Sequence, residues 1–157
     1  MNRWETWLLH VLTAVVTITG IVYFWMKYLL ETGDPFQVIN HPWQPFMLKS
    51  HILVAPALIF AVGLITKSHI LRKLNTTRVN RFSGGLALFS FPCMVISGYL
   101  LQVVTDETGS RIVLVLHLVT GVLFAGAYLI HQMITFRSWM KRIKRRRVRR
   151  LVIQGKE

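Results

Sequence analysis

Hydrophobic residues form four long runs along the chain, and shorter polar segments separate them. The runs cover about residues 4–30, 46–71, 84–104 and 112–136. Each reaches about 20 residues, the length with which a helix crosses the ~30 Å hydrocarbon core of a bilayer. Aromatic residues lie at or near the run ends, as in interfacial belts: Trp4, Trp7, Trp25, Tyr28, Trp43 and Trp139. The pattern predicts an all-α integral membrane protein, built as a bundle of four transmembrane helices.

Composition supports the membrane class. Of the 157 residues, 53% are hydrophobic and only 16% are charged, and the mean hydropathy is +0.46. A soluble domain needs more charged residues on its surface. The single cysteine, Cys93, excludes an internal disulfide, and no Cys-x-x-Cys-His motif would attach a haem covalently. The run over 4–30 is too long for a signal peptide and lacks a cleavage site, so we expect it to be retained.

Positive charge is concentrated in two of the polar segments. The chain has 19 Lys and Arg against 6 Asp and Glu, and most cations lie in residues 67–81 and 137–150. Residues 31–45 and 105–111 hold most of the carboxylates. The positive-inside rule therefore predicts that both termini are cytoplasmic. The predicted domains are a membrane part, 1–140, and a basic cytoplasmic tail, 141–157.

The basic tail raises the question of a polyanionic partner. Its simplest interpretation is a topology signal that lies against anionic headgroups. Specific binding of anionic lipid or RNA is the alternative, but cations confined to short segments between apolar runs do not indicate a nucleic-acid protein. No internal repeat is evident. Ser83, Gly84 and Gly85 would form a hinge or, more simply, allow close helix packing.

Histidines inside the apolar runs are the main functional signal. Five of the six fall within the runs, where an ionisable residue is costly and suggests a functional site. His117 and His131 are fourteen residues apart, hence only ~40° apart around a helix and ~21 Å apart along it. This spacing suits two haems stacked across a bilayer. On the same face, Gly121 would make room for a flat macrocycle, and Phe124 and Tyr128 would pack between the rings; ordinary helix packing explains these three equally well.

Depth along the helices pairs the histidines. His51 and His117 each lie ~8 Å below the outer start of their run, whereas His10 and His131 lie ~28–30 Å below the outer edge. We therefore expect two bis-histidine haem b groups, the outer one on His51 and His117 and the inner one on His10 and His131. Zinc fits less well, because it needs three or four ligands around one point.

His69 competes with His10 as the inner ligand. It lies ~27 Å from His51 along the same helix face, at the inner surface. A headgroup, a haem propionate or a quinone would also contact it there, and an ordinary interfacial histidine is the simplest interpretation. We expect His41 to be exposed in the outer loop. The cations placed to meet haem propionates are Lys49 and Arg111 outside, and Arg3, Lys67 and Arg137 inside, although all five also suit snorkelling.

The positions of these histidines resemble those of bacterial cytochrome b561-type membrane proteins. The same plan occurs in the cytochrome b subunits of membrane-bound formate dehydrogenases and nickel-iron hydrogenases. The resemblance covers residues 4–137 and lies in position and spacing. It implies an outer haem b on His51 and His117, an inner haem b on His10 and His131, and quinone chemistry near one of them. The chain departs from the group at Val11, where a Trp often follows the first histidine.

The expected function is electron transfer across a bacterial inner membrane. The chain would connect the quinone pool with a periplasmic cytochrome or an iron–sulfur subunit, within a larger hetero-oligomeric complex. The loop from Phe36 to Pro45 is the expected docking surface. Two rival functions are a haem-free membrane anchor or assembly subunit and a small proton-conducting transporter. For the transporter, the only broken-helix signals are Pro56 and Pro92.

Overall fold

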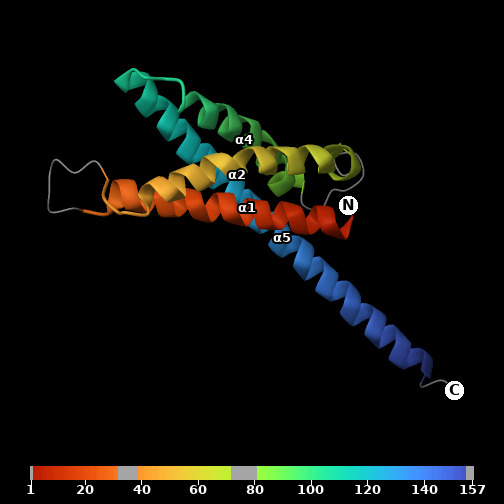
Figure 1. Ribbon diagram of the computed structural model, residues 1–157. Helices are drawn as coiled ribbons and strands as arrows, with labels where there is room; N and C mark the ends of the chain where they lie inside the picture. The colour runs from red at the N-terminus through yellow and green to blue at the C-terminus, as the bar shows by residue number, and fades with distance from the viewer. Residues whose placement is uncertain (1, 32–38, 72–80, 155–157) are drawn as a thin grey trace. The chain divides into compact units, whose positions relative to one another are not determined.

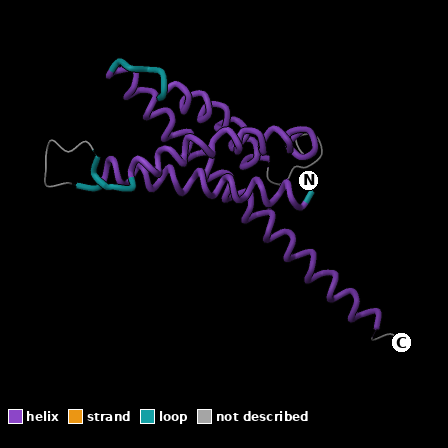
Figure 2. The backbone as a smooth tube through the Cα atoms, in the orientation of Figure 1, coloured by secondary structure: helices purple, strands orange, loops and turns teal. Residues whose placement is uncertain are grey.

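Four long α-helices and two short π-helical segments make up the computed structural model, which describes residues 2–31, 39–71 and 81–154 (Figure 1). The α-helices are α1 (Arg3–Phe24), α2 (Gln44–Ile65), α4 (Arg81–Leu100) and α5 (Glu107–Gln154). The segments η1 (Trp25–Leu29) and η2 (Thr66–Leu71) continue α1 and α2. Within the described ranges the backbone has no strand (Figure 2). The predicted all-α class is therefore confirmed.

Each α-helix contributes one segment that is long and apolar enough to cross a membrane. These segments are Arg3–Leu29, Gln44–Ile65, Phe82–Leu100 and Glu107–Arg146. Large apolar side chains cover their outer surfaces; Leu53, Phe89 and Val122 are 79%, 74% and 73% exposed. A protein in water buries such side chains, whereas lipid would cover them here. The prediction of four helices that are long and apolar enough to cross a membrane is therefore confirmed.

The chain divides into two compact units of two helices each. The first unit covers Met1–Thr76 and packs α1 on α2, and the second covers Thr77–Glu157 and packs α4 on α5. Both predicted interior prolines, Pro56 and Pro92, lie within unbroken α-helices. Each unit is therefore a helical hairpin, and the site is built from contacts inside each hairpin.

The start of α2 differs from the hydropathy pattern. The helix begins at Gln44, before the apolar run, with Pro45 in its first turn, where a missing N–H breaks no helical hydrogen bond. The preceding turn is held by His41, whose Nδ1 accepts a 3.1 Å hydrogen bond from the Trp43 N–H. His41 was expected to be exposed but is half-buried, because it belongs to this turn.

Asn40 joins the end of η1 to the start of α2. Its side-chain amide donates to the carbonyl oxygens of Lys27 at 3.0 Å and Leu30 at 3.3 Å. Its backbone N–H donates to Oε1 of the buried Gln44 at 3.0 Å. These bonds satisfy polar groups at the ends of both helices. Residues 32–38, which include the first three residues of the predicted docking loop, lie outside the described residues.

Helix α5 is longer than the predicted span at both ends. Asp106 caps its start, because Oδ2 accepts the Gly109 N–H at 2.7 Å. The helix then continues through the span to Gln154 without a break. The first part of the predicted basic tail, residues 141–154, is therefore helical.

The contact between α4 and α5 repeats every seven residues. Ser83, Ser90 and Ser97 on α4 are 6%, 1% and 0% exposed. The hydroxyls of Ser90 and Ser97 each donate at 2.8 Å to the carbonyl four residues earlier, so they are satisfied within α4. Small residues at this interval let the helix backbones approach closely, which drives packing where lipid replaces water.

Candidate functional site

The imidazole of His51 is held against α1 inside the first unit. Its Nδ1 lies 2.9 Å from the backbone carbonyl oxygen of Val16 and 3.4 Å from the hydroxyl oxygen of Thr19. A carbonyl oxygen only accepts, so the ring donates its Nδ1–H to Val16. In the neutral ring this tautomer carries the lone pair on Nε2, the nitrogen that would then bind a metal.

Gly20 makes this close contact possible. In a helix, each Cβ tilts toward the N-terminus and covers the turn that precedes it. A Cβ on Gly20 would lie 2.9 Å from Cε1 and 3.1 Å from Nδ1 of His51. The histidine ring therefore occupies the space of the missing side chain, and the contact requires glycine.

His117 has the same environment inside the second unit. Its Nδ1 lies 3.0 Å from the carbonyl oxygen of Met94 and 3.2 Å from the hydroxyl oxygen of Ser97. A Cβ on Gly98 would lie 3.1 Å from Cε1 of His117. The Ser97 hydroxyl donates to the Cys93 carbonyl, so its oxygen is available to accept from the ring. His117 is therefore also held as the Nδ1–H tautomer.

The two environments define a repeated local pattern, which we call the histidine seat. One helix supplies a backbone carbonyl at position i, a hydroxyl side chain at i+3 and a glycine at i+4. The next helix of the same unit supplies the histidine. The seat residues lie in Val16–Gly20 and Met94–Gly98, whose last three residues read Ile-Thr-Gly and Ile-Ser-Gly. Sequence reasoning found no repeat, because this one is short and becomes evident only from the contacts.

His131 contacts a looser version of the seat. Its Nδ1 lies 3.4 Å from the Ser83 hydroxyl oxygen, and a Cβ on Gly84 would lie 3.5 Å from that nitrogen. The residue four before Gly84 lies outside the described residues. Gly84 is within α4 and faces His131, so the packing explanation of this glycine is supported over the hinge.

The remaining two predicted ligand candidates lie in the first unit. His10 is half-buried in α1, and His69 is half-buried in η2. Each interacts with at least one neighbouring group. Among the described residues, no glycine has His10 or His69 among its nearest neighbours, whereas Gly20 has His51.

Three residues predicted to surround the macrocycles contribute to the packing of α5. A Cβ on Gly121 would lie 3.9 Å from the sulfur of Met94 on α4. Phe124 is 7% exposed, and its ring centroid lies 5.2 Å from Phe91 and 6.0 Å from Tyr128. The contacts of Gly121 and Phe124 support the ordinary helix-packing explanation.

The predicted propionate partners are exposed. Lys49 lies two residues before His51 on α2, so the two side chains point about 160° apart around the helix. Arg111 pairs with Glu107 at 2.6 Å, and the two side chains are 77% and 80% exposed. Arg3, Lys67 and Arg137 are exposed as well.

Sequence reasoning overlooked one cation at the end of the first predicted span. Lys27 places its amino group 5.7 Å from the centroid of the Tyr23 ring and 5.5 Å from that of Tyr28. Its spacing from Tyr23, at i+4 on one helix face, was the available signal.

The described residues contain no group of three or more His, Cys, Asp or Glu side chains that would hold a metal ion. A haem b iron does not need such a group, because two axial imidazoles complete its coordination. Comparisons with protein-family models, curated proteins and solved structures gave no match for the chain. The histidines and their surroundings are therefore the features of this chain that bear on its function.

Proposed function

We propose that this chain is a di-haem b-type cytochrome that transfers electrons across a membrane. The observation that supports it best is the pair of matching seats around His51 and His117. A histidine that binds a metal usually donates its other ring N–H to a backbone carbonyl or carboxylate, which sets the tautomer and the ring orientation. Val16 and Met94 provide such carbonyls at 2.9 and 3.0 Å.

Depth along the helices gives all four proposed ligands, and the tautomer supports His51 and His117. His51 and His117 would ligate the outer haem, and His10 and His131 the inner one. His69 is the alternative inner ligand, or a contact of a propionate or quinone. The donor set fits the group, since neutral imidazoles in apolar helices are the ligands that a b-type haem needs. Bound haem supplies one-electron redox chemistry, while the chain orients the rings and excludes water.

The proposed orientation places both termini in the cytoplasm of a bacterial cell. The cations of residues 67–81 and 137–150 would then face the inner side. In this orientation Lys49, Lys27 and Arg111 lie toward the outer surface. Electrons would pass between the quinone pool and a periplasmic cytochrome or iron–sulfur subunit of a larger complex.

A reduced-minus-oxidised absorption spectrum of the purified full-length protein tests this function, with pyridine haemochrome quantitation. We expect a b-type α band and two haems per chain. One haem per chain would limit the proposal to a single ligand pair. Absence of haem from freshly prepared membranes would refute the electron-transfer function and favour a haem-free anchor or assembly subunit.

A further inference from the structure

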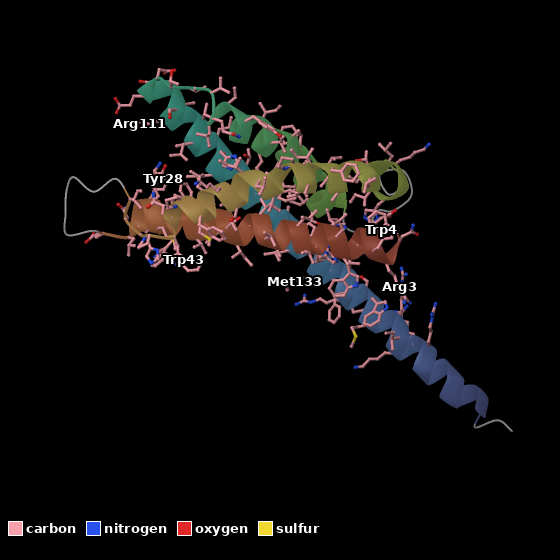
Figure 3. The ribbon with its side chains drawn as sticks, in the orientation of Figure 1. Arg3, Trp4, Tyr28, Trp43, Arg111 and Met133 are labelled. Atoms are coloured by element: carbon pink, nitrogen blue, oxygen red, sulfur yellow. The ribbon has the colours of Figure 1, made fainter. Side chains whose placement is uncertain are left out.

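The stretch of α5 that follows its apolar span has two opposite faces. Four exposed apolar side chains follow helical spacing on one face: Phe136, Trp139, Met140 and Ile143 are 61%, 54%, 44% and 42% exposed. Ser138, Lys141, Arg142 and Arg145 have the same spacing. At 100° per residue, the centres of the two sets lie about 160° apart around the helix. This stretch, which follows the labelled Met133 in Figure 3, is thus amphipathic.

The polar set forms a cationic patch, and its own helix supplies no nearby carboxylate that would pair with the cations. Ser138, Lys141, Arg142 and Arg145 line a shallow hollow of about 190 Å³. After Glu107, α5 contains no further Asp or Glu. Two guanidinium groups, one ammonium and one hydroxyl on the same face are the donors that bind a phosphate, with arginine able to make bidentate hydrogen bonds.

The position of this face indicates which phosphate it meets. Because α5 is unbroken, the face begins just after the apolar run of residues 112–136. From Ser138 to Arg145 the helix rises about 10 Å, enough to cross the ~5–8 Å thickness of one headgroup layer. The opposite face carries Trp139, with its ring 5.8 Å from that of Phe136, and aromatic residues are common at this depth.

We propose that Ser138, Lys141, Arg142 and Arg145 form a binding site for the phosphate of an anionic phospholipid. The apolar face favours lipid over RNA, because Phe136 and Trp139 at its start would lie at the acyl–headgroup boundary while the cations reach the phosphate. The proposal is independent of the haem function.

Lipid titration of the purified full-length protein, followed by native mass spectrometry, tests the site. The test variant is Lys141→Gln/Arg142→Gln/Arg145→Gln, and the matched control is Arg137→Gln/Lys144→Gln/Arg146→Gln. Both remove three charges from the same exposed stretch. We expect phosphatidylglycerol to bind the test variant at least about tenfold more weakly than the wild type, and the control variant within about threefold. Arg142→Lys keeps the positive charge but removes the planar guanidinium group that makes two hydrogen bonds to one phosphate. It should give an intermediate loss of affinity.

Several results would overturn the site. Equal losses in both triple variants would show diffuse surface charge, and equal binding of phosphatidylcholine would show that the anionic headgroup is not recognised. Displacement of the lipid by inorganic phosphate would reveal an ion site, and tighter binding of a short RNA would reveal a nucleic-acid site. Circular dichroism of each variant verifies that α5 remains helical.

Discussion

The ring of His51 fills the space that a side chain on Gly20 would occupy. A Cβ added to Gly20 would lie only 2.9 Å from Cε1 of His51. Contacts under 3.0 Å do not occur for a real Cβ, so an alanine at this position must displace the ring or the helix. The His51 hydrogen bond to Val16 depends on the same approach. The orientation of His51 therefore depends on a residue of the neighbouring helix.

Gly20→Ala should therefore remove most of one haem per chain. Displacement of the ring lengthens the Nδ1 hydrogen bond to Val16, and the nitrogen that would bind iron moves with it. The measurement is haem content and the reduced spectrum of the purified protein. Gly63→Ala is the matched control, since a Cβ there meets nothing within 4 Å and alanine favours the helix by about 1 kcal/mol. Two intact haems with unchanged spectra in Gly20→Ala would refute the role of the seat.

Two glycines of the second unit lie at different distances from a histidine, so their substitutions should have effects of different size. Gly98→Ala would bring a Cβ to 3.1 Å from His117, whereas Gly84→Ala would bring one to 3.5 Å from His131, an ordinary contact. We expect Gly98→Ala to lower haem content clearly and Gly84→Ala to remain close to the wild type. The same haem quantitation measures both. Equal losses from the two variants would contradict a distance-dependent effect.

Histidine variants test whether the two units share one haem. His51→Ala and His117→Ala should each leave about one haem per chain. If both ligate the outer haem, the double variant should also retain one haem, because the same group has already been lost. Loss of both haems in the double variant, but not in the singles, would show that these histidines serve different groups. His41→Ala is the control and should retain two haems, because His41 lies in the turn before α2.

The structure of α4 and α5 also predicts an effect on stability. Phe124 is 7% exposed and packs on Phe91, while Phe89 is 74% exposed on the same hairpin. Phe124→Ala should lower the free energy of unfolding by about 3–5 kcal/mol, because it leaves a cavity between the helices. Phe89→Ala should change it by less than about 0.5 kcal/mol. Denaturant unfolding in detergent measures both, and equal effects would show that Phe124 is not part of the packed contact.

Hydropathy predicted the spans well because bilayer thickness fixes the length of an apolar helix. It predicted the helix ends less well. Hydropathy measures how favourably a segment lies in lipid, whereas a helix can continue through polar residues outside the lipid. Gln44 and Pro45 begin α2 ahead of the apolar run, since proline suits a first turn. Lys and Arg continue α5 to Gln154, since both residues favour helices.

The candidate site was only partly predictable for a different reason. The depth of each histidine can be predicted from helical rise, because depth depends only on residue spacing within one helix. The histidine seat depends on the register between two helices, which spacing within one helix does not contain. A hydroxyl residue followed by glycine, in or beside an apolar run, was a partial signal. It occurs at Thr19, Ser83 and Ser97, each of which contacts a histidine ring. It also occurs at Thr120, whose hydroxyl donates to a carbonyl of its own helix, so the motif alone does not identify a histidine contact.

The proposed orientation predicts which positions an outside reagent reaches. Cysteine at Thr105, in the exposed connection before α5, should react with a membrane-impermeant maleimide added to intact cells. Cysteine at Arg146, in the basic stretch that follows the apolar run of residues 112–136, should react only after the membrane is permeabilised, because Lys and Arg concentrate on the cytoplasmic side. Both variants are made in a Cys93→Ser background, so that the native thiol does not react. Labelling of position 146 in intact cells, with protection of position 105, would reverse the topology and exchange the outer and inner histidine pairs.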